Sequence, residues 1–411
     1  MTENYITRTL ESTIQRAGKT FPAILVTGPR QSGKTTLLQK LFAKTHRYVS
    51  MENPDQRARW LADPVAFFNA TPPPVIFDEV QYTPELLHYI KSAIDAKRKP
   101  GQWILSGSQN FALMQNVSQS LAGRCAVLAL LPLAIEEIMQ QKGRTIDQRL
   151  DEQFNSKWPP APGISATTTL PLENWLLRGG YPEISVNAEV DRQLWCASYI
   201  QTYLERDVRQ IVKVGDLNTF QRFLRLCAGR TGQILNQSEL ARDVGVAVPT
   251  IKSWLSVLEA SHQIFLLPPY FNNFGKRLSK SPKLYFMDTG LASFLLGLHE
   301  TEPLMKGPML GPLFETMVVA NWVKNFQHHG EPPPLYYWRS NDSLEVDLLI
   351  ERNNRLYPFE IKSTQTVLPG HFEGLNKWKE LANRPKQRGL VVAATNEATA
   401  LLGNNVVPWF L

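Results

Sequence analysis

Residues 28–35 place two glycines, a lysine and a threonine at Gly-x4-Gly-Lys-Thr spacing, between an apolar run at 23–27 and a helix-like pattern at 36–42. The glycines let backbone N–H groups turn inward around phosphate oxygens, and the positive end of the following helix faces the same anion. Lys34 is suited to neutralising the β- and γ-phosphates, and the Thr35 hydroxyl to holding Mg²⁺. The pattern predicts an ATP and Mg²⁺ site, with nucleotide contacts from Gly28, Pro29, Arg30, Gln31, Ser32, Gly33, Lys34, Thr35 and Thr36.

Two carboxylates end the apolar run at 74–77 and supply the second part that ATP chemistry needs. Asp78 is predicted to bind Mg²⁺, and Glu79 to polarise the attacking water. An acidic pair at a strand end can also serve solubility alone. The four buried-type residues that lead into this pair favour the active-site interpretation.

Two other polar features near this site stay open. The polar residues 106–110 follow an apolar run at 103–106, at the strand end where open α/β sheets bind ligands. Ser108 or a neighbour could contact the γ-phosphate, and a plain turn fits equally well. Arg124 could stabilise charge on the γ-phosphate in its own site or in a neighbouring subunit's, and a structural ion pair fits equally well.

A different group of charged residues lies near the C-terminus. Glu315 falls in a helical pattern at 311–323, and Asp347 in an apolar run at 344–350. Glu360 and Lys362 share one face of an expected strand, because side chains alternate along a strand. Asp347 on the neighbouring strand could complete a carboxylate pair with Glu360 for Mg²⁺, and Lys362 could steady or deprotonate a water. A binding platform without cleavage is the alternative.

The elements that must position these residues follow an α/β pattern. Short apolar runs alternate with helical patterns between residues 21 and 133, which predicts a parallel sheet covered by helices. A Pro/Thr-rich interval within 140–170 indicates an insertion or linker. Strands are expected at 23–27, 47–50, 75–78, 103–106 and 126–130.

The middle of the chain shows helix–turn–helix spacing followed by two strands. Helical patterns at 220–228, 236–244 and 248–259 precede strands at 264–270 and 283–286, which predicts a winged helix. The cations between these two strands, at the tip of the wing, suit contacts to DNA phosphates, whereas the third helix offers few side chains that read bases. A protein-binding module or a solvated hairpin is the alternative. The cations are Lys276, Arg277, Lys280 and Lys283, and the third helix offers Thr250, Lys252 and Ser253.

Composition sets broad limits. A chain of 411 residues is long for one core, so two or three domains are expected. The 44 basic and 37 acidic residues give a net charge of +7, compatible with nucleic acid and with many ordinary proteins. The three cysteines are widely spaced, which indicates neither a disulfide framework nor a zinc site. We expect a cytoplasmic protein without membrane contact, since no signal-peptide core and no long uncharged apolar stretch appears.

Two family resemblances extend these expectations. The order of a helix with Glu315, three strands, a helix at 372–381 and a strand at 388–394 resembles the PD-(D/E)XK nuclease superfamily. This resemblance implies metal and catalytic roles for Glu315, Asp347, Glu360 and Lys362. Over nearly its whole length the chain resembles bacterial and archaeal AAA-type ATPases with a winged helix and a nuclease-like C-terminal domain. The matching motifs are 28–35, 77–81, 106–108, 121–124, 178–183, 203–207 and 286–290.

These features together predict three domains and an ATPase function. We expect an AAA-type ATPase domain at 1–212, a winged-helix domain at 213–300 and a nuclease-like domain at 301–411. The preferred function is an ATPase that acts on or near DNA. The alternatives are a regulatory switch that binds protein partners or its own copies without cleavage, and an ATP-gated DNA nuclease. The predicted catalytic residues are Lys34, Glu79, Arg124, Asp347, Glu360 and Lys362.

Overall fold

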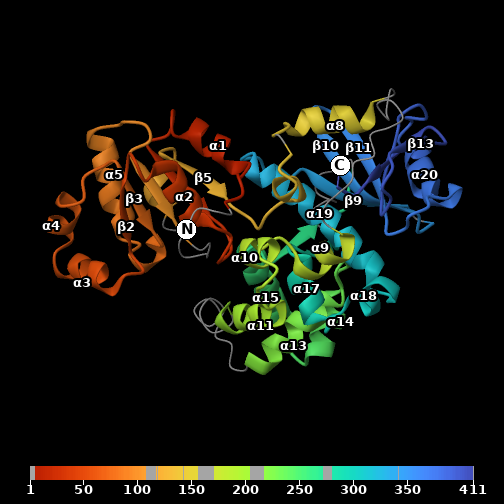
Figure 1. Cartoon of the computed structure of the whole chain (residues 1–411), viewed down its shortest axis with the longest axis horizontal. Helices are drawn as coiled ribbons and strands as arrows, with labels where there is room; N and C mark the ends of the chain where they lie inside the picture. The colour runs from red at the N-terminus through yellow and green to blue at the C-terminus, as the bar shows by residue number, and fades with distance from the viewer. Residues whose placement is uncertain are drawn as a thin grey trace.

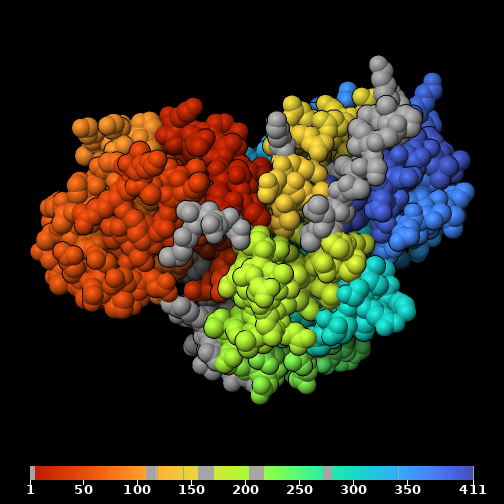
Figure 2. Space-filling model, in the orientation of Figure 1, coloured from red at the N-terminus to blue at the C-terminus, as the bar shows by residue number. Residues whose placement is uncertain are grey.

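A computed structural model of the chain describes residues 5–107, 117, 119–141, 143–155, 171–203, 217–271, 280–340 and 342–410. Figure 1 shows the N-terminal sheet and its helices on one side, with the middle helices and the C-terminal sheet on the other. The space-filling view in Figure 2 shows the same parts as bodies in contact. No helix among the described residues has the length and hydrophobicity needed to cross a membrane.

The N-terminal sheet contains five parallel strands in the order β2-β3-β4-β1-β5. The strands expected at 23–27, 47–50, 75–78 and 103–106 are confirmed at their predicted bounds. The fifth strand is shifted by one residue toward the N-terminus. Each of β1, β3 and β4 is buried along its whole length, which explains their continuous apolar sequences. The strands are β1 Ala23–Thr27, β2 Arg47–Ser50, β3 Val75–Asp78, β4 Trp103–Ser106 and β5 Cys125–Ala129.

Helices cover both faces of this sheet. Ile24 and Val26 of β1 pack with the α1 and α2 side, and Leu25 packs with the α3, α4 and α5 side, as expected for alternating side chains. Asn53 and Asp63 cap α3 and α4, each followed by a proline in the first turn. The helices are α1 Leu10–Ala17, α2 Lys34–Phe42, α3 Pro54–Ala62, α4 Pro64–Asn69 and α5 Leu86–Ala96, with a 3₁₀ turn η1 Val80–Tyr82.

A helical region and a small sheet form the middle of the chain. The three helices and two strands expected there are present, and a short third strand, β6, adds to an antiparallel sheet in the order β6-β8-β7. Gly245 ends α14 with a φ of 80°, a conformation that glycine adopts without strain. The elements are α7 Ile135–Ile138, α8 Ile146–Phe154, α9 Leu172–Arg178, α10 Pro182–Val186, α11 Arg192–Tyr203, α13 Leu217–Ala228, β6 Gln233–Ile234, α14 Gln237–Val244, α15 Val248–Ala260, β7 Ile264–Leu267 and β8 Lys283–Phe286.

The C-terminal part is a six-stranded mixed sheet in the order β13-β14-β12-β11-β10-β9. The expected succession of a helix, three strands, a helix and a strand is present as α19, β9 to β11, α20 and β12, followed by the unpredicted β13 and β14. The elements are α17 Thr289–Leu295, α18 Thr301–Lys306, α19 Leu310–His328, β9 Leu335–Arg339, β10 Glu345–Arg352, β11 Arg355–Lys362, η3 Pro369–Phe372, α20 Glu373–Leu381, β12 Leu390–Ala393, β13 Thr399–Leu401 and β14 Asn404–Pro408.

Helix α19 lies at the centre of the molecule. Most of its residues are buried, and it contacts β5 of the N-terminal sheet, β8 of the middle sheet and β11 of the C-terminal sheet. One hydrophobic cluster joins α19 to the middle helices and to β10, β11, β12 and β14. The middle and C-terminal parts therefore share one core, while the domain boundaries near residues 212 and 300 stay predictions.

Candidate functional site

The predicted phosphate loop has the backbone of an anion-binding turn. Gly28 and Gly33 have φ values of 139° and 93°, and α2 begins directly after Gly33. A Cβ at Gly28 would lie 2.1 Å from the Leu130 carbonyl oxygen, so this approach to the end of β5 requires glycine. The buried Lys34 ammonium donates to the carbonyl oxygens of Gly28 and Pro29 at 3.1 and 2.8 Å. The lysine is thus folded back over the loop that would hold the phosphates.

Asp78 gathers three hydroxyl groups at the end of β3. Its carboxylate accepts hydrogen bonds from Thr35 Oγ1 at 2.8 Å, from Tyr48 at 2.6 Å and from Ser106. Tyr48 and Ser106 come from β2 and β4, the two strands beside β3. Burial, together with this hydrogen bond to Asp78, raises the pKa of Tyr48. The carboxylate is therefore fixed in place by neutral donors.

The Thr35 hydroxyl and the Asp78 carboxylate fit the oxygen set that Mg²⁺ requires. Adjacent oxygens of an octahedral Mg²⁺ shell with ligands at 2.0–2.1 Å lie about 2.9 Å apart. The 2.8 Å separation of Thr35 Oγ1 and Asp78 Oδ2 is close to this value. These two residues could thus hold one metal ion together, as the sequence predicts.

Glu79 occupies a left-handed backbone position directly after β3. Its φ is 57°, and its backbone N–H donates to Ser106 Oγ at 3.4 Å. The Gln81 side-chain amide donates to the Glu79 carboxylate. A non-glycine residue held at positive φ is a feature of functional turns. This turn places the half-buried Glu79 beside Lys34 and Thr35 in one pocket.

The pocket over the phosphate loop has a volume of about 410 Å³ and includes a second wall from the middle of the chain. Tyr199 and Thr202 of α11 form that wall. His262, in the turn between α15 and β7, also lies near, since burial and then the charge of Lys34 lower its pKa to about 4. Ser108 lies outside the described residues. The remaining lining residues are Arg30, Gln31, Gly33, Lys34, Thr35, Thr36 and Glu79.

Arg124 does not belong to the ATP site of its own chain, so that alternative is wrong. It precedes β5, whose first residue, Cys125, pairs with Ala23 at the start of β1. The phosphate loop follows the opposite ends of these parallel strands, roughly 15 Å away for strands that rise about 3.3 Å per residue. Arg124 instead donates to Asp95 at 2.6 and 3.1 Å at the surface, which is the structural ion pair.

The C-terminal residues predicted from spacing do come together. Asp347 of β10 and Glu360 of β11 flank the paired residues Leu348 and Phe359 of two antiparallel strands. Lys362 Nζ lies 2.5 Å from Glu360 Oε1 and 3.7 Å from Asp347 Oδ2. Asp347 also accepts a hydrogen bond from the Ile361 N–H at 2.7 Å. The expected face of two carboxylates and one lysine is present.

Two further carboxylates and a second lysine complete this group. Glu315, Glu345 and Asp347 bring carboxylate oxygens within 4.8 Å of one another. Lys283 of β8 contacts Glu315 at 3.0 Å and also contacts Glu345. Tyr285 donates to Glu315 at 2.5 Å. We call Glu315, Glu345, Asp347 and Glu360 the acidic cluster.

The predicted phosphate contact of Lys283 is therefore wrong, since its side chain is only 5% exposed and faces two carboxylates. Of the other three cations, Lys276 and Arg277 lie outside the described residues, and Lys280 is exposed. On α15, Lys252 and Ser253 are exposed and Thr250 is partly buried. Of the residues predicted to contact DNA phosphates, those exposed in the described part of the chain are Lys280 and, on α15, Lys252 and Ser253.

Crowding changes the ionisation of the acidic cluster. Burial, followed by the charge of Asp347, raises the pKa of Glu315 to about 7 and that of Glu360 to about 8. Glu360 Oε2 is buried and has no hydrogen-bond partner among the described residues. When all four carboxyls are ionised, above these pKa values, they exceed the two ammonium groups of Lys283 and Lys362 by two negative charges. This donor set fits a divalent cation.

Several site residues were not found from the sequence. Tyr48 lies two positions before the end of β2, so no strand-end pattern indicates it. Ser106 ends β4 and belongs to the polar residues 106–110 that the sequence does predict at this end of the sheet. Glu345 lies two positions before Asp347, so strand alternation could have placed it on the same face. Tyr199 and Lys283 reach their sites through packing between distant segments, and no local pattern indicates them.

Three family models match successive parts of the chain. Residues 20–139 match the family model described as an AAA domain, which contains the phosphate loop and the Asp78–Glu79 pair. Residues 170–302 and 310–411 match two models described as domains of unknown function, DUF8612 and DUF4143.

Two mycobacterial proteins are similar to most of the chain. The uncharacterized proteins Rv2008c of Mycobacterium tuberculosis and Mb2031c of Mycobacterium bovis are each 33% identical over 355 residues, which is 86% of this chain and 73% of each relative. Among solved structures, the Walker-type ATPase PABY2304 of Pyrococcus abyssi is 16% identical, with 72% of this chain and 97% of that one covered and a TM-score of 0.45. A signal transduction ATPase with numerous domains, PH0952 of Pyrococcus horikoshii, is 11% identical, with 79% and 48% covered and a TM-score of 0.27.

Proposed function

We propose that this chain, which belongs to the family of AAA-domain proteins represented by the two mycobacterial relatives, hydrolyses ATP at the phosphate loop and uses the nucleotide cycle to act on or near DNA. The AAA-type P-loop ATPase domain is shown by the family match. The observation that supports turnover is the single pocket shared by Lys34, Thr35 and Glu79, with Asp78 bonded to Thr35.

Each of these residues has one role in the proposed reaction. Lys34 exchanges its bonds to the loop carbonyls for phosphate oxygens and offsets their charge. Thr35 and Asp78 would hold Mg²⁺, which would supply positive charge to offset that of the phosphates. Glu79 accepts a proton from the attacking water, and Gln81 orients the Glu79 carboxylate. Tyr199 and Thr202 close the pocket from α11.

The test separates binding from turnover. We expect Glu79→Gln to keep ATP affinity and to lower kcat by on the order of 10³-fold, because the amide no longer takes the proton. Lys34→Ala should lose ATP binding itself. Phosphate release and fluorescent ATP binding measure the two effects, and Glu85→Gln, an exposed carboxylate on the same segment, is the matched control. Undiminished phosphate release by Glu79→Gln would remove Glu79 from the base role.

Contact with DNA is proposed for the predicted winged helix. The support is the helix–turn–helix order of α14 and α15, with Lys252 and Ser253 exposed on the second helix. We expect DNA to stimulate ATP turnover and the double variant Lys252→Glu, Lys280→Glu to weaken binding uniformly across sequences. Each lost phosphate contact should reduce the slope of log affinity against log salt by about 0.9. Lys306→Glu on α18 is the control, and an unchanged slope would reject the contact.

A metal-dependent nuclease centre is the second candidate, supported by the charge imbalance of the acidic cluster. Glu315, Glu345 and Asp347 would hold the cation, because their carboxylate oxygens lie together. Lys362, paired with Glu360, would orient or deprotonate a water. We expect Mn²⁺-dependent DNA cleavage that Asp347→Ala and Lys362→Ala abolish and that the exposed-site variant Asp342→Ala retains. Absence of cleavage together with nucleotide-dependent capture of a protein would favour the regulatory switch instead.

A further inference from the structure

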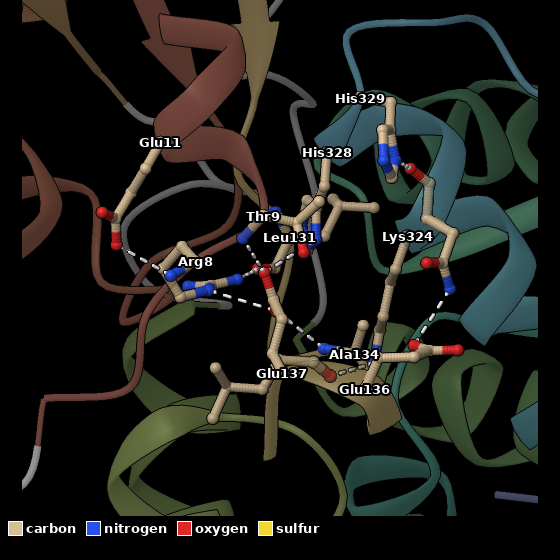
Figure 3. Close-up of polar contacts among 12 residues, drawn as sticks. Arg8, Thr9, Glu11, Leu131, Ala134, Glu136, Glu137, Lys324, His328 and His329 are labelled. Carbon is tan, nitrogen blue, oxygen red and sulfur yellow. Dashed lines mark hydrogen bonds and ion pairs between the residues drawn. The ribbon is translucent and has the colours of Figure 1, made fainter. Parts of the chain in front are cut away.

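Arg8 lies beneath the phosphate loop, before the first helix of the chain. Its side chain is 4% exposed. Nη1 donates to the Ser32 carbonyl oxygen at 2.9 Å, and Nη2 donates to the Leu131 carbonyl oxygen at 2.6 Å. Ser32 belongs to the phosphate loop, and Leu131 follows β5. One planar guanidinium therefore joins the loop backbone to the segment that leaves the sheet, as Figure 3 shows for Arg8 and Leu131.

Glu137 of α7 is the buried partner of this guanidinium. The two side chains are 3.2 Å apart, and that of Glu137 is 1% exposed. The carboxylate also accepts from the backbone N–H groups of Thr9 and Ala134 at 2.7 and 2.9 Å. Burial alone would raise the pKa of Glu137, but the charge of Arg8 and the contact with His328 hold it below its usual range. Glu137 thus remains a charged anchor (Figure 3).

His328 connects this anchor to α19. Its Nε2 accepts from the Leu131 N–H at 3.2 Å, so the proton of the neutral ring is on Nδ1, which lies 3.3 Å from Glu137 Oε1. Burial lowers the pKa of His328, which favours this neutral form. Nearby, Lys324 donates to the Leu133 carbonyl and Asn321 accepts from the Ile135 N–H. The C-terminal half of α19 is therefore docked on residues 131–137 (Figure 3).

The other half of the same helix carries Glu315 of the acidic cluster. Thirteen positions separate Glu315 from His328 within α19 Leu310–His328, which corresponds to about 20 Å along the axis at 1.5 Å per residue. Glu315 contacts Lys283 and Tyr285 of β8. One buried, continuous helix thus touches the network behind the phosphate loop at one end and the acidic cluster at the other.

We propose that Arg8 is a positioning residue of the ATP site, and that Arg8, Glu137 and His328 form a joint through which the state of the phosphate loop reaches α19. Lys34 must leave the carbonyls of Gly28 and Pro29 when phosphates bind, so the loop rearranges around the point that Arg8 holds. A buried ion pair with fixed hydrogen bonds transmits such a shift because it has few alternative arrangements. This inference rests on the ATPase function proposed above.

The first arm of the test uses the wild-type chain. We expect saturating AMP-PNP to change amide hydrogen exchange in peptides that cover residues 310–328. A wild-type protein that fails to bind AMP-PNP would contradict the proposed ATPase function. A wild-type protein that binds AMP-PNP and hydrolyses ATP, but whose α19 exchange is the same with and without the analogue, would overturn the joint alone.

The second arm separates the loop side of the joint from its helix side. Arg8→Lys keeps the charge but cannot reach both carbonyls and the carboxylate, so kcat should fall by about 10-fold to 10²-fold and the α19 response should be lost. Glu137→Gln does not touch the loop and should lose the α19 response with a smaller change in kcat and KM. The exposed Lys19→Gln, just after α1, should match wild type in all three readouts.

Two results in this second arm would overturn the proposal. One is an Arg8→Lys protein with wild-type kcat and KM; the other is an Arg8→Lys or Glu137→Gln protein that binds AMP-PNP and keeps the full α19 response. If either variant fails to fold, the double variant Arg8→Met, Glu137→Gln replaces the buried pair by neutral side chains of similar size and is read in the same way.

Discussion

The ATP site and the acidic cluster both collect carboxylates at strand ends, but they balance charge in different ways. At the ATP site, Asp78 is held by the hydroxyls of Thr35, Tyr48 and Ser106, none of which cancels its charge. In the acidic cluster, Lys283 and Lys362 contact the carboxylates directly. The first site is prepared for an external cation, whereas the second already contains two internal ones.

The two sites also differ in how they are assembled. The ATP site uses eight consecutive residues and the ends of adjacent parallel strands. The acidic cluster takes Lys283 from β8, Glu315 from α19, and the other acids from β10 and β11. A site built from separate segments depends on how those segments pack, so its ionisation and its stability are linked.

The largest effect that tests this difference is expected at Asp78. Asp78→Asn keeps the shape of the side chain and one acceptor oxygen but removes the charge that holds Mg²⁺, so kcat for ATP should fall by on the order of 10³-fold. Tyr48→Phe, which removes only one of the three donors, should change kcat far less. Steady-state phosphate release at saturating Mg²⁺ measures both.

Equal losses in Asp78→Asn and Tyr48→Phe would contradict this assignment, because they would show that the hydrogen-bond geometry matters rather than the charge. Thermal unfolding of both variants checks that each remains folded.

The next effect is one of stability and belongs to the acidic cluster. Lys283→Met removes the ammonium between Glu315 and Glu345 and should lower the free energy of unfolding by about 3 kcal/mol, because breaking a buried pair leaves unpaired carboxylates. The double variant Lys283→Met, Glu315→Gln should recover part of that loss. Urea denaturation of the single and double variants measures the coupling.

A control lysine distinguishes the loss of the buried ion pairs of Lys283 from the loss of a positive charge in general. Lys306 on α18 pairs with Glu302 at the surface, and Lys306→Met should change stability by well under 1 kcal/mol. If Lys283→Met were as mild as Lys306→Met, the cluster would not depend on its internal cation.

The sequence indicated which residues lie together around the phosphate loop because they belong to local motifs. The central strands are buried on both faces and read as continuous apolar runs, and the phosphate loop is contiguous. In the acidic cluster, strand alternation found Asp347, Glu360 and Lys362 for the same reason. The position of Arg124 could also be predicted from the sequence. It precedes β5 and so lies at the amino ends of the parallel strands, away from the phosphate loop.

What the sequence could not predict depends on packing between distant segments. Lys283 lies in a run of cations without neighbouring acids, and its partner Glu315 is 32 positions away. Arg8 and His328 are brought together by Glu137, and no periodicity in the chain connects the three. Such contacts are set by how the helices dock, so they need the three-dimensional structure.

The pH dependence of stability tests whether the ATP site includes a residue from the middle of the chain, His262, in addition to the phosphate-loop motif. Burial and then the charge of Lys34 lower the pKa of His262 to about 4, from an ordinary value of 6.5. The unfolded chain therefore binds more protons between pH 4 and 6.5, so the stability that His262 contributes is complete above pH 6.5 and is lost as the pH falls toward 4. Between pH 7.5 and 5.5, wild type should lose about 1 kcal/mol more stability than His262→Gln.

Urea denaturation at the two pH values measures this difference, with the exposed His88→Gln as the control. Equal pH dependence in wild type and His262→Gln would show that the middle of the chain does not bury this ring beside the loop.

The smallest effect is expected at Arg124. It tests whether the ATP site is confined to the carboxyl ends of the parallel strands. Arg124→Ala removes an exposed ion pair with Asp95 at the amino ends of the strands, so kcat, KM and the thermal midpoint should stay close to wild type. Phosphate release is measured at several protein concentrations. A fall in kcat that grows with protein concentration would mean that Arg124 enters the site of a neighbouring copy, and the ATP site would then be no more local than the acidic cluster.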